Sequence, residues 1–272
     1  MKKFCVIGNP VNHSKSPDIF SYIFDTLNIN AKYYTKEILD NDAFNEFIVK
    51  NKSTYSGFNI TAPFKRQAYK IVDQIHSSAC ELNSVNCIEN KNDKLVGYNT
   101  DAYGFEMMLK NRPEDLKNKI FLILGNGTVA QTVCSVLCDN YLNEISILGR
   151  SIENVKKFIQ NINEIKISSN IIEEYSYKKN KSYIIINCLP LNIDEKSTDN
   201  ILSYIPISNI ELVIDLNYID SKLTEKFKLL NYNICSGYEM LLFQAIKSFE
   251  IWFKNNPSNI EYSAIKKHII NE

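Results

Sequence analysis

The chain has 272 residues, a length typical of about two domains. Hydrophobic residues make up 44% and charged residues 23% of it, as in a globular protein with a sizeable core. Lysine plus arginine number 31 and aspartate plus glutamate also number 31, so the net charge is zero. This balance argues against nucleic acid or an acidic membrane surface as a partner.

In its N-terminal half the chain alternates short β-rich apolar runs with longer amphipathic stretches, which predicts an α/β fold. Ser16 is the expected N-cap of a helix over 17–27, with Pro17 at its first position. A helix over 102–110 ends at Arg112-Pro113. The other elements expected here are strands at 4–7, 32–36 and 57–60, a helix over 41–50, and a hairpin of 84–89 and 94–98 around the polar turn 90–93.

A second series of strands and helices begins near Lys119. Residues 120–124 are continuously apolar, as expected at the centre of a parallel sheet. Strands are also predicted at 144–148, 183–186 and 212–216, and helices over 128–138 and 239–253. Because no repeat or flexible linker is apparent, the start of this series defines the expected domain boundary.

Other sequence features favour a cytoplasmic protein without a bound metal. The first apolar run is too short for a signal peptide and stops at Gly8-Asn9-Pro10. No stretch of about 18 apolar residues could span a membrane. The seven cysteines contain no C-x-x-C pair, which favours buried, reduced thiols over disulfides or a zinc site.

A glycine motif follows the apolar strand at 120–124 and opens the next predicted helix. It reads Gly125, Asn126, Gly127, Thr128, Val129, Ala130, a G-x-G-x-x-A element. The first glycine allows a tight turn, the second lets the backbone approach a pyrophosphate, and the alanine lets the helix pack closely. The helix N-terminus then offers unpaired N–H groups to the phosphates. This arrangement predicts a dinucleotide site.

The end of the next predicted strand bears on the choice of dinucleotide. NAD sites usually carry an acidic residue here for the ribose hydroxyls, whereas this chain has Arg150 and Ser151. A guanidinium can pair with a 2′-phosphate, so these residues favour NADP. Glu153 lies close enough in sequence to leave NAD open.

Four polar motifs occur in the first 101 residues, each at a predicted strand end or tight loop. Taken singly, they also fit local roles: helix caps for the serines and for Asp101, a strand-end turn, and a surface lysine at position 65. The motifs are Gly8–Pro17 (GNPVNHSKSP), Asn59–Lys65 (NITAPFK), Asn83–Asn86 (NSVN) and Gly97–Asp101 (GYNTD).

Together these motifs resemble the shikimate dehydrogenase family, in the same order and spacing. The resemblance extends to a C-terminal segment, Ser236–Ala245 (SGYEMLLFQA), followed by an aromatic helix. It implies that Lys65 and Asp101 form the catalytic pair. It further implies substrate contacts from Ser14, Ser16, Asn59, Thr61, Asn86, Tyr218 and Gln244, and cofactor contacts from Asn187, Gly237 and Met240 beside the glycine motif.

The resemblance implies a Rossmann-type nucleotide-binding domain over 102–236 and an α/β substrate domain over 1–101, completed by helices from 237 to 272. These helices would bring Gln244 beside Lys65. The implied reaction is the reversible NADPH-dependent reduction of 3-dehydroshikimate to shikimate, in chorismate and aromatic amino acid biosynthesis, by a monomer or homodimer. An NAD-dependent quinate/shikimate dehydrogenase and a non-catalytic dinucleotide-binding relative remain open alternatives.

Overall fold

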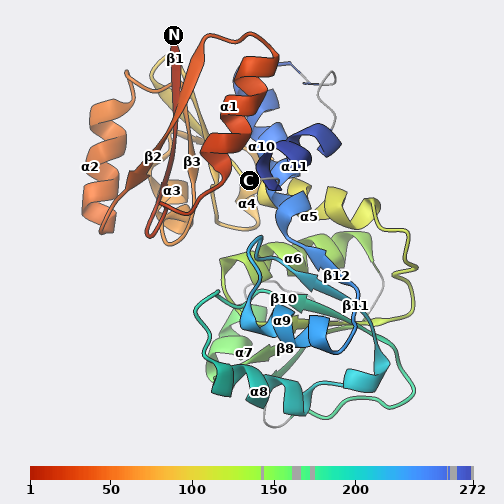
Figure 1. The fold of residues 1–272 in the computed structure, drawn as a ribbon. Coiled ribbons are helices and arrows are strands. Elements are labelled where there is room, and N and C mark those ends of the chain that lie inside the picture. Colours follow the sequence, from red (N-terminus) through yellow and green to blue (C-terminus); the bar gives the residue numbers. More distant parts are fainter. Residues whose placement is uncertain (142–143, 161–166, 172–174, 256, 258–261, 271–272) are drawn as a thin grey trace. The chain divides into compact units, whose positions relative to one another are not determined.

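The computed structural model describes residues 1–141, 144–160, 167–171, 175–255, 257 and 262–270. The chain divides into two compact units (Figure 1). Unit 1 comprises Met1–Met107 with Leu241–Glu272, and unit 2 comprises Met108–Met240. Across the described ranges, no helix is both long and apolar enough to cross a bilayer.

The sheet of unit 1 mixes parallel and antiparallel neighbours in the order β2-β1-β3-β5-β6-β4. The inner strand β1 is parallel to both β2 and β3, while β5 is antiparallel to β3 and β6. The strands are β1 (Lys2–Gly8), β2 (Ala31–Glu37), β3 (Gly57–Ile60), β4 (Gln74–Ile75), β5 (Cys87–Lys91) and β6 (Lys94–Tyr98). The predicted hairpin is confirmed, but its first strand is Cys87–Lys91 and not 84–89. The turn is therefore only two residues long, and Asn92 and Asp93 adopt the φ angles of 52° and 62° that such a turn requires.

Helices cover both faces of this sheet, and side chains of β1 alternate between the two layers. Cys5 and Ile7 join a core cluster with α2 (Asn41–Asn51) and α3 (Lys65–Ile71). On the other face, Phe4 stacks on Trp252 of α10 (Tyr238–Phe253) with ring centroids 4.4 Å apart. Figure 1 shows α2 on one side of the sheet and α1 (Ser16–Thr26) with α10 on the other.

The predicted N-cap of α1 is wrong. The helix begins at Ser16 itself, so Lys15 is the N-cap and makes no side-chain capping bond. The reason is that the Ser14 hydroxyl accepts the hydrogen bond from the Ser16 N–H (3.3 Å), which lets the helix start one residue early. Ser16 is therefore a buried residue of the first turn.

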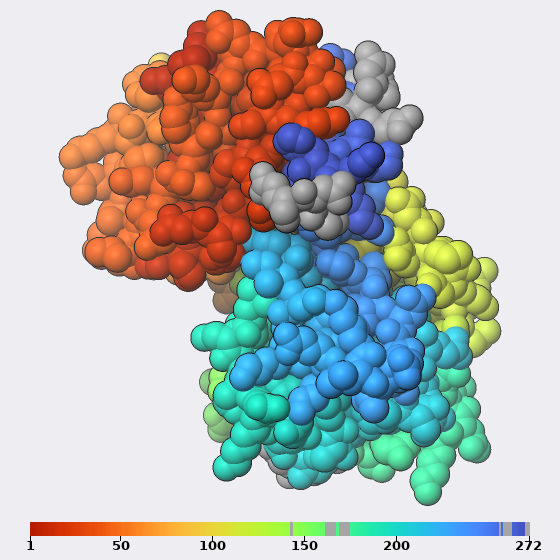
Figure 2. All heavy atoms as spheres, viewed as in Figure 1, coloured from red at the N-terminus to blue at the C-terminus, as the bar shows by residue number. Residues whose placement is uncertain are grey.

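The C-terminal part of the chain, from Leu241 onward, returns to unit 1 and contributes most of α10 and all of α11. The C-terminal α11 (Tyr262–Ile270) packs on α1, where the rings of Tyr22 and His268 lie 4.7 Å apart. In Figure 2 the dark-blue atoms of α11 lie against the orange-red atoms of α1. Unit 1 also contains α4 (Ser77–Cys80) and most of α5 (Asp101–Lys110).

Unit 2 is built on a wholly parallel sheet in the order β12-β11-β10-β7-β8-β9. Numbered within the unit and read from β9, this is the 3-2-1-4-5-6 order of dinucleotide-binding domains. Its strands are β7 (Ile120–Leu124), β8 (Ile145–Gly149), β9 (Ile167–Ile171), β10 (Tyr183–Asn187), β11 (Ile210–Asp215) and β12 (Ile234–Ser236). The fold class expected from the sequence, an α/β domain plus a Rossmann-type domain, is confirmed.

Strands β7 and β10 form the centre of this sheet, and every residue in them is buried. The helices of unit 2 are α6 (Thr128–Asn140), α7 (Ile152–Gln160), α8 (Glu195–Tyr204) and α9 (Lys222–Leu229), with a short 3₁₀ turn at Ile207–Asn209. The strand order reverses between β7 and β10, so the carboxyl ends of these two strands form the position where such sheets bind ligands.

Candidate active site

A buried ion pair joins Lys65 and Asp101. Lys65 is the first residue of α3 and Asp101 the first of α5. The Lys65 Nζ lies 2.7 Å from Asp101 Oδ2, and the two side chains are only 12% and 11% exposed. The Asn99 side chain accepts hydrogen bonds from the N–H groups of Asp101 and Ala102 at the start of α5. Because Asn99 caps the helix, the Asp101 carboxylate is left for Lys65.

Asn86 holds the other oxygen of the same carboxylate. Its Nδ2 donates to Asp101 Oδ1 at 2.9 Å and to Thr100 Oγ1 at 3.0 Å. Its Oδ1 accepts from the Thr100 backbone N–H at 2.7 Å, which fixes the orientation of the amide. Asp101 is therefore held between a cation and a neutral donor, and it can neutralise and orient the ammonium.

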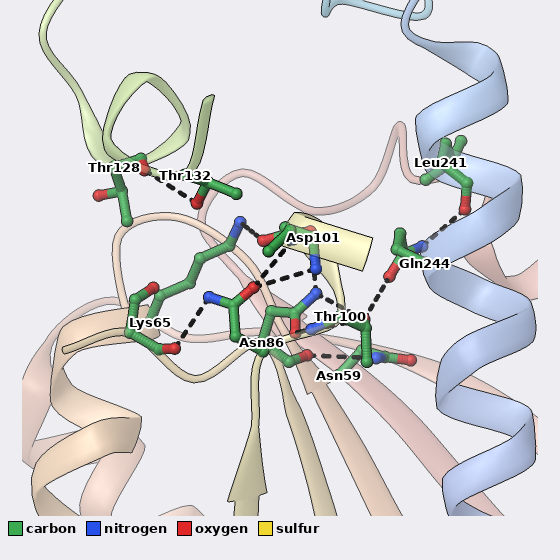
Figure 3. Close-up of polar contacts among 12 residues, drawn as sticks. Asn59, Lys65, Asn86, Thr100, Asp101, Thr128, Thr132, Leu241 and Gln244 are labelled. Atoms are coloured by element: carbon green, nitrogen blue, oxygen red, sulfur yellow. Dashed lines mark hydrogen bonds and ion pairs between the residues drawn. The ribbon is translucent and has the colours of Figure 1, made fainter. Parts of the chain in front are cut away.

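Gln244 reaches this cluster from α10. Its Oε1 lies 3.5 Å from Thr100 Oγ1, and its Nε2 donates to the Leu241 carbonyl. Figure 3 shows Thr100 and Asp101 between Lys65 and Gln244. The structure thus brings together Lys65, Asp101, Asn86 and Gln244 from four separate parts of the sequence.

The remaining substrate candidates of unit 1 lie at nearby strand and helix ends. Ser14 is half-buried just before α1, and Ser16 is buried in the first turn of that helix. Thr61 follows β3, and its N–H donates to the Ile7 carbonyl of β1. Asn59 is the buried third residue of β3, and both amide protons go to protein atoms, the Asn86 carbonyl and the Ser248 hydroxyl.

In unit 2, the glycine turn has the geometry needed by a ligand that approaches the backbone. Gly125 has a φ of 102°, which favours glycine, and its N–H donates to the Leu148 carbonyl. Gly127 has ordinary extended angles, and no atom lies within 4 Å of the position a Cβ would take. Neither backbone strain nor packing therefore requires glycine at 127, whereas a pyrophosphate against the chain would.

The start of α6 is open to an anion in the same way. Gly127 is the N-cap and provides no side-chain bond to the first N–H groups of the helix. Thr128 and Val129 are half-buried in the first turn, and Ala130 is fully buried. Unpaired N–H groups at a helix N-terminus suit phosphate oxygens.

Arg150 and Ser151 follow β8, the strand beside β7. Arg150 is exposed, while Ser151 precedes α7 and its carbonyl accepts the Val155 N–H. The Asn126 side chain comes within 3.7 Å of the Cβ position of Gly149, so the glycine turn and this loop are neighbours. Arg150 is thus an exposed residue of a loop that adjoins the glycine turn.

A buried carboxylate, Asp215, organises the loops after β10 and β11. Its Oδ1 accepts from the Asn187 amide at 3.1 Å and from the Asn217 N–H at 2.9 Å, and its Oδ2 accepts from the Ser221 hydroxyl at 2.7 Å. The Thr224 hydroxyl also donates to it. Asn187 therefore hydrogen-bonds to the protein through both its amide nitrogen and its amide oxygen, which accepts the Leu189 N–H, and it orders the end of β10.

The same loops carry the last three candidates. Tyr218 is half-buried, and burial raises the pKa of its phenol. Gly237 packs so tightly that a Cβ would collide with the Leu216 backbone, and its N–H donates to the Asp215 carbonyl at 2.5 Å. Met240 is buried in the first turn of α10.

Sequence reasoning missed three polar residues that support these candidates. Thr100 lies inside the quoted GYNTD motif, and Ser248 lies one helical turn after Gln244, so their positions could have suggested them. Asp215 lies inside the strand predicted at 212–216 and is the last residue of β11, so a charged residue in an otherwise apolar run could have suggested it. Among the described residues, no group of three His, Cys, Asp or Glu side chains could hold a metal ion.

Family models match both halves of the chain. A model described as "Shikimate dehydrogenase substrate binding domain" matches residues 6–88. A second, described as "Shikimate / quinate 5-dehydrogenase", matches residues 107–203.

Individual relatives are similar over almost the full length. A "Shikimate dehydrogenase (NADP(+))" of Nitrosopumilus maritimus is 31% identical over 99% of this chain and 98% of its own. One of Clostridium beijerinckii is 31% identical over 93% and 92%. The crystal structure of the shikimate dehydrogenase of Aquifex aeolicus is 26% identical, with a TM-score of 0.83 over 99% of this chain and 97% of that one. The chain belongs to the shikimate dehydrogenase family.

Proposed function

We propose that this chain is an NADP-dependent shikimate dehydrogenase that reversibly reduces 3-dehydroshikimate to shikimate. The reaction is a step of chorismate and aromatic amino acid biosynthesis. The printed names of the relatives support the activity and the cofactor. The observation that carries the proposal for this chain is the buried Lys65–Asp101 pair, with Nζ and Oδ2 2.7 Å apart.

The pair has the chemistry that reduction of a ring ketone requires. As the carbonyl carbon gains a hydride, negative charge develops on the ketone oxygen and a proton must reach it. The Lys65 ammonium supplies that proton and stabilises the charge. In the reverse direction the Lys65 amine accepts the proton of the substrate hydroxyl, and Asp101 keeps the resulting ammonium in place.

The substrate is a carboxylate with ring hydroxyls, and the polar residues of unit 1 suit both groups. We assign the carboxylate to Ser14 and Ser16, with Tyr218 of unit 2 as a further partner. The assigned hydroxyl ligands are Asn59, Thr61, Asn86 and Gln244. Buried amides and hydroxyls discriminate strongly, because a substrate that lacks a hydroxyl leaves one of them unpaired.

Unit 2 fits a dinucleotide, since Gly127 leaves room at the backbone and α6 offers free N–H groups. We assign the pyrophosphate to the turn and first helical residues, Gly125 through Ala130. Arg150 and Ser151 would take the 2′-phosphate, while Asn187, Gly237 and Met240 would line the nicotinamide. When bound, NADPH supplies the hydride.

The same proposal includes the roles of the two domains, the oligomeric state and the cellular location. Substrate binding is assigned to residues 1–101 with 237–272, and the dinucleotide to residues 102–236. The enzyme acts as a monomer or homodimer on small molecules. Its location is the cytoplasm, as its reduced cysteines suggest.

A spectrophotometric assay tests the function. Purified protein is mixed with shikimate or quinate and with NADP or NAD, and absorbance of the reduced nicotinamide is followed. Shikimate with NADP should give the highest kcat/KM of the four combinations. A higher value with NAD or with quinate would favour the quinate/shikimate alternative, and no turnover in any combination would favour a non-catalytic relative.

A further inference from the structure

A buried hydroxyl outside the sites described so far holds one of the candidate substrate residues. The Tyr33 hydroxyl of β2 lies 2.7 Å from Asn59 Oδ1. The Tyr33 ring stacks on Phe20 with centroids 4.4 Å apart and planes 7° from parallel. Only 8% of Tyr33 is exposed, and burial raises the pKa of its phenol well above the usual value. The phenol is therefore a fixed, protonated donor.

The hydrogen-bond directions around Asn59 follow from its partners. Its Nδ2 lies 3.2 Å from the Asn86 backbone carbonyl, which can only accept, so the amide nitrogen must face that side. The other Nδ2 proton goes to Ser248 Oγ at 3.0 Å. Oδ1 then faces Tyr33, whose hydroxyl must donate.

From Ser248 the chain of hydrogen bonds continues to the catalytic pair. Ser248 is fully buried on α10, and its Oγ donates to the Gln244 carbonyl one turn earlier. Its second neighbour is Thr100 Oγ1 at 3.3 Å. Thr100 in turn contacts Asn86, which holds Asp101. One connected network therefore runs from Tyr33, through Asn59 and Ser248, to Asp101.

We propose that Tyr33 and Ser248 are positioning residues that together fix the Asn59 amide for substrate binding, an inference that rests on the function proposed above. Neither side chain touches the substrate in this assignment. Tyr33 saturates one lone pair of Asn59 Oδ1 and Ser248 accepts one amide proton, so the second lone pair of Oδ1 is the group left to accept from a ring hydroxyl.

Removal of the Tyr33 or the Ser248 hydroxyl should leave the Asn59 side-chain amide free to rotate. Without Tyr33 Oη, Asn59 Oδ1 is buried with an unmet hydrogen bond, so the side chain turns to find another partner. Substrate affinity then falls, because a preorganised acceptor has become mobile. The Lys65–Asp101 pair keeps its own partner Asn86, so the chemical step is little changed.

The first test is Tyr33→Phe, which retains the ring stack. We expect KM for shikimate to rise about tenfold, while kcat changes less than threefold and KM for NADP less than twofold. Tyr34→Phe is the matched control, since Tyr34 is the next residue of β2, lies 37% exposed and pairs with Tyr55. It should leave all three constants unchanged.

The second test is Ser248→Ala, alone and with Tyr33→Phe. We expect a similar rise in shikimate KM for the single variant. In the double variant the rise should fall well short of the product of the two, because both act through one amide. If Tyr33→Phe failed to fold, Ser248→Ala alone would test the proposal: its shikimate KM should rise while its NADP KM and its kcat stay nearly unchanged.

The outcomes separate this inference from the proposed function. Turnover of shikimate by the wild type with an unchanged shikimate KM in Tyr33→Phe and Ser248→Ala would overturn the inference alone. Equal rises in the shikimate and NADP KM values would also overturn it, since they would indicate a general structural effect. Failure of the wild type to use shikimate would overturn the proposed function first.

Discussion

The Lys65–Asp101 pair is a poor candidate for a purely stabilising contact. Both side chains are nearly buried, and the cost of removing two charges from water often equals or exceeds their attraction. Apolar residues of the same volume would hold α3 to α5 at least as well. The pair makes physical sense if a charged amine is needed at this place, as it is for proton transfer to an alkoxide.

Lys65→Gln isolates that role. The amide of glutamine can still donate to Asp101, but it has no proton to give to the ketone oxygen. We expect kcat to fall by about 10²–10⁴-fold with little change in melting temperature, measured by the NADPH absorbance assay and by circular dichroism. Lys70→Gln, on the same helix but exposed, is the control and should retain full activity. A kcat above one tenth of the wild-type value in Lys65→Gln would remove Lys65 from the proposed role.

Helix α10 is anchored to the sheet of unit 1 by a close contact at Trp252. The indole N–H of Trp252 donates to the Ile88 carbonyl at 3.0 Å, and the ring lies over Gly57 of β3. A Cβ at position 57 would lie 2.7 Å from Trp252 Cε2, closer than real side chains approach. The same helix carries Gln244 and Ser248, so the anchor also sets the position of these two side chains.

Gly57→Ala should therefore displace the indole. We expect a loss of about 1–3 kcal/mol in the free energy of unfolding, which is the usual cost of overpacking a core. Because Trp252 is the single tryptophan of the chain, a red shift of intrinsic fluorescence would report its movement. Gly127→Ala provides the stability control, as its Cβ would enter open space. An unchanged emission maximum and unfolding midpoint in Gly57→Ala would contradict the anchor.

The sequence predicts best the elements that are buried throughout and end abruptly. Residues 57–60 and 120–124 were predicted with the bounds that the structure has, because every side chain in them is buried and a loop follows at once. Helices α3, α8 and α9 were missed. They are only seven, ten and eight residues long and bury one or two apolar side chains each, so the sequence offers few positions that mark them as helices.

The candidate residues at motif positions could be predicted, but the network that connects them could not. Tyr33 and Asn59 are 26 residues apart, and Asn59 and Ser248 are 189 apart. No local pattern marks such pairs, since their meeting depends on the strand order and on the return of α10 to unit 1. The wrong N-cap at Ser16 has a related cause: the Ser14 hydroxyl accepts the Ser16 N–H, and sequence alone does not decide which of two nearby serines caps the first turn.

Buried thiols in unit 1 couple its folding to pH. Burial raises the pKa of Cys5 to about 12 from the ordinary 9.0, and Lys36 acts weakly in the opposite direction. The folded-state pKa exceeds the unfolded one, so the contribution to stability is fully present below about pH 9 and is lost as pH rises towards 12. Each such thiol should cost about 1.4 kcal/mol per pH unit within that window. Cys87 behaves in the same way.

Cys5→Ala should flatten this dependence. Denaturant unfolding followed by Trp252 fluorescence at pH 8 to about 10.5 should give a slope shallower than wild type by about 1.4 kcal/mol per pH unit. Cys80→Ala, at an exposed cysteine, should keep the wild-type slope. Parallel slopes for Cys5→Ala and wild type would show that this thiol stays protonated in both states or is ionised in both.

The stability of the whole chain should depend on NADP, because a ligand that binds only the folded state adds to the free energy of unfolding. At a ligand concentration 100 times Kd the gain is about 2.7 kcal/mol.

Gly127→Val is a variant that should abolish this gain without lowering stability in the absence of ligand. Residue 127 has φ −82° and ψ −174°, which any residue adopts, and its Cβ would meet no atom within 4 Å. Thermal unfolding by circular dichroism, with and without NADP, should show equal midpoints for the free proteins and an upward shift with NADP only in the wild type. If Gly127→Val kept that shift, the pyrophosphate would not lie against this turn. If it lost stability without NADP, glycine would be required there by the fold instead.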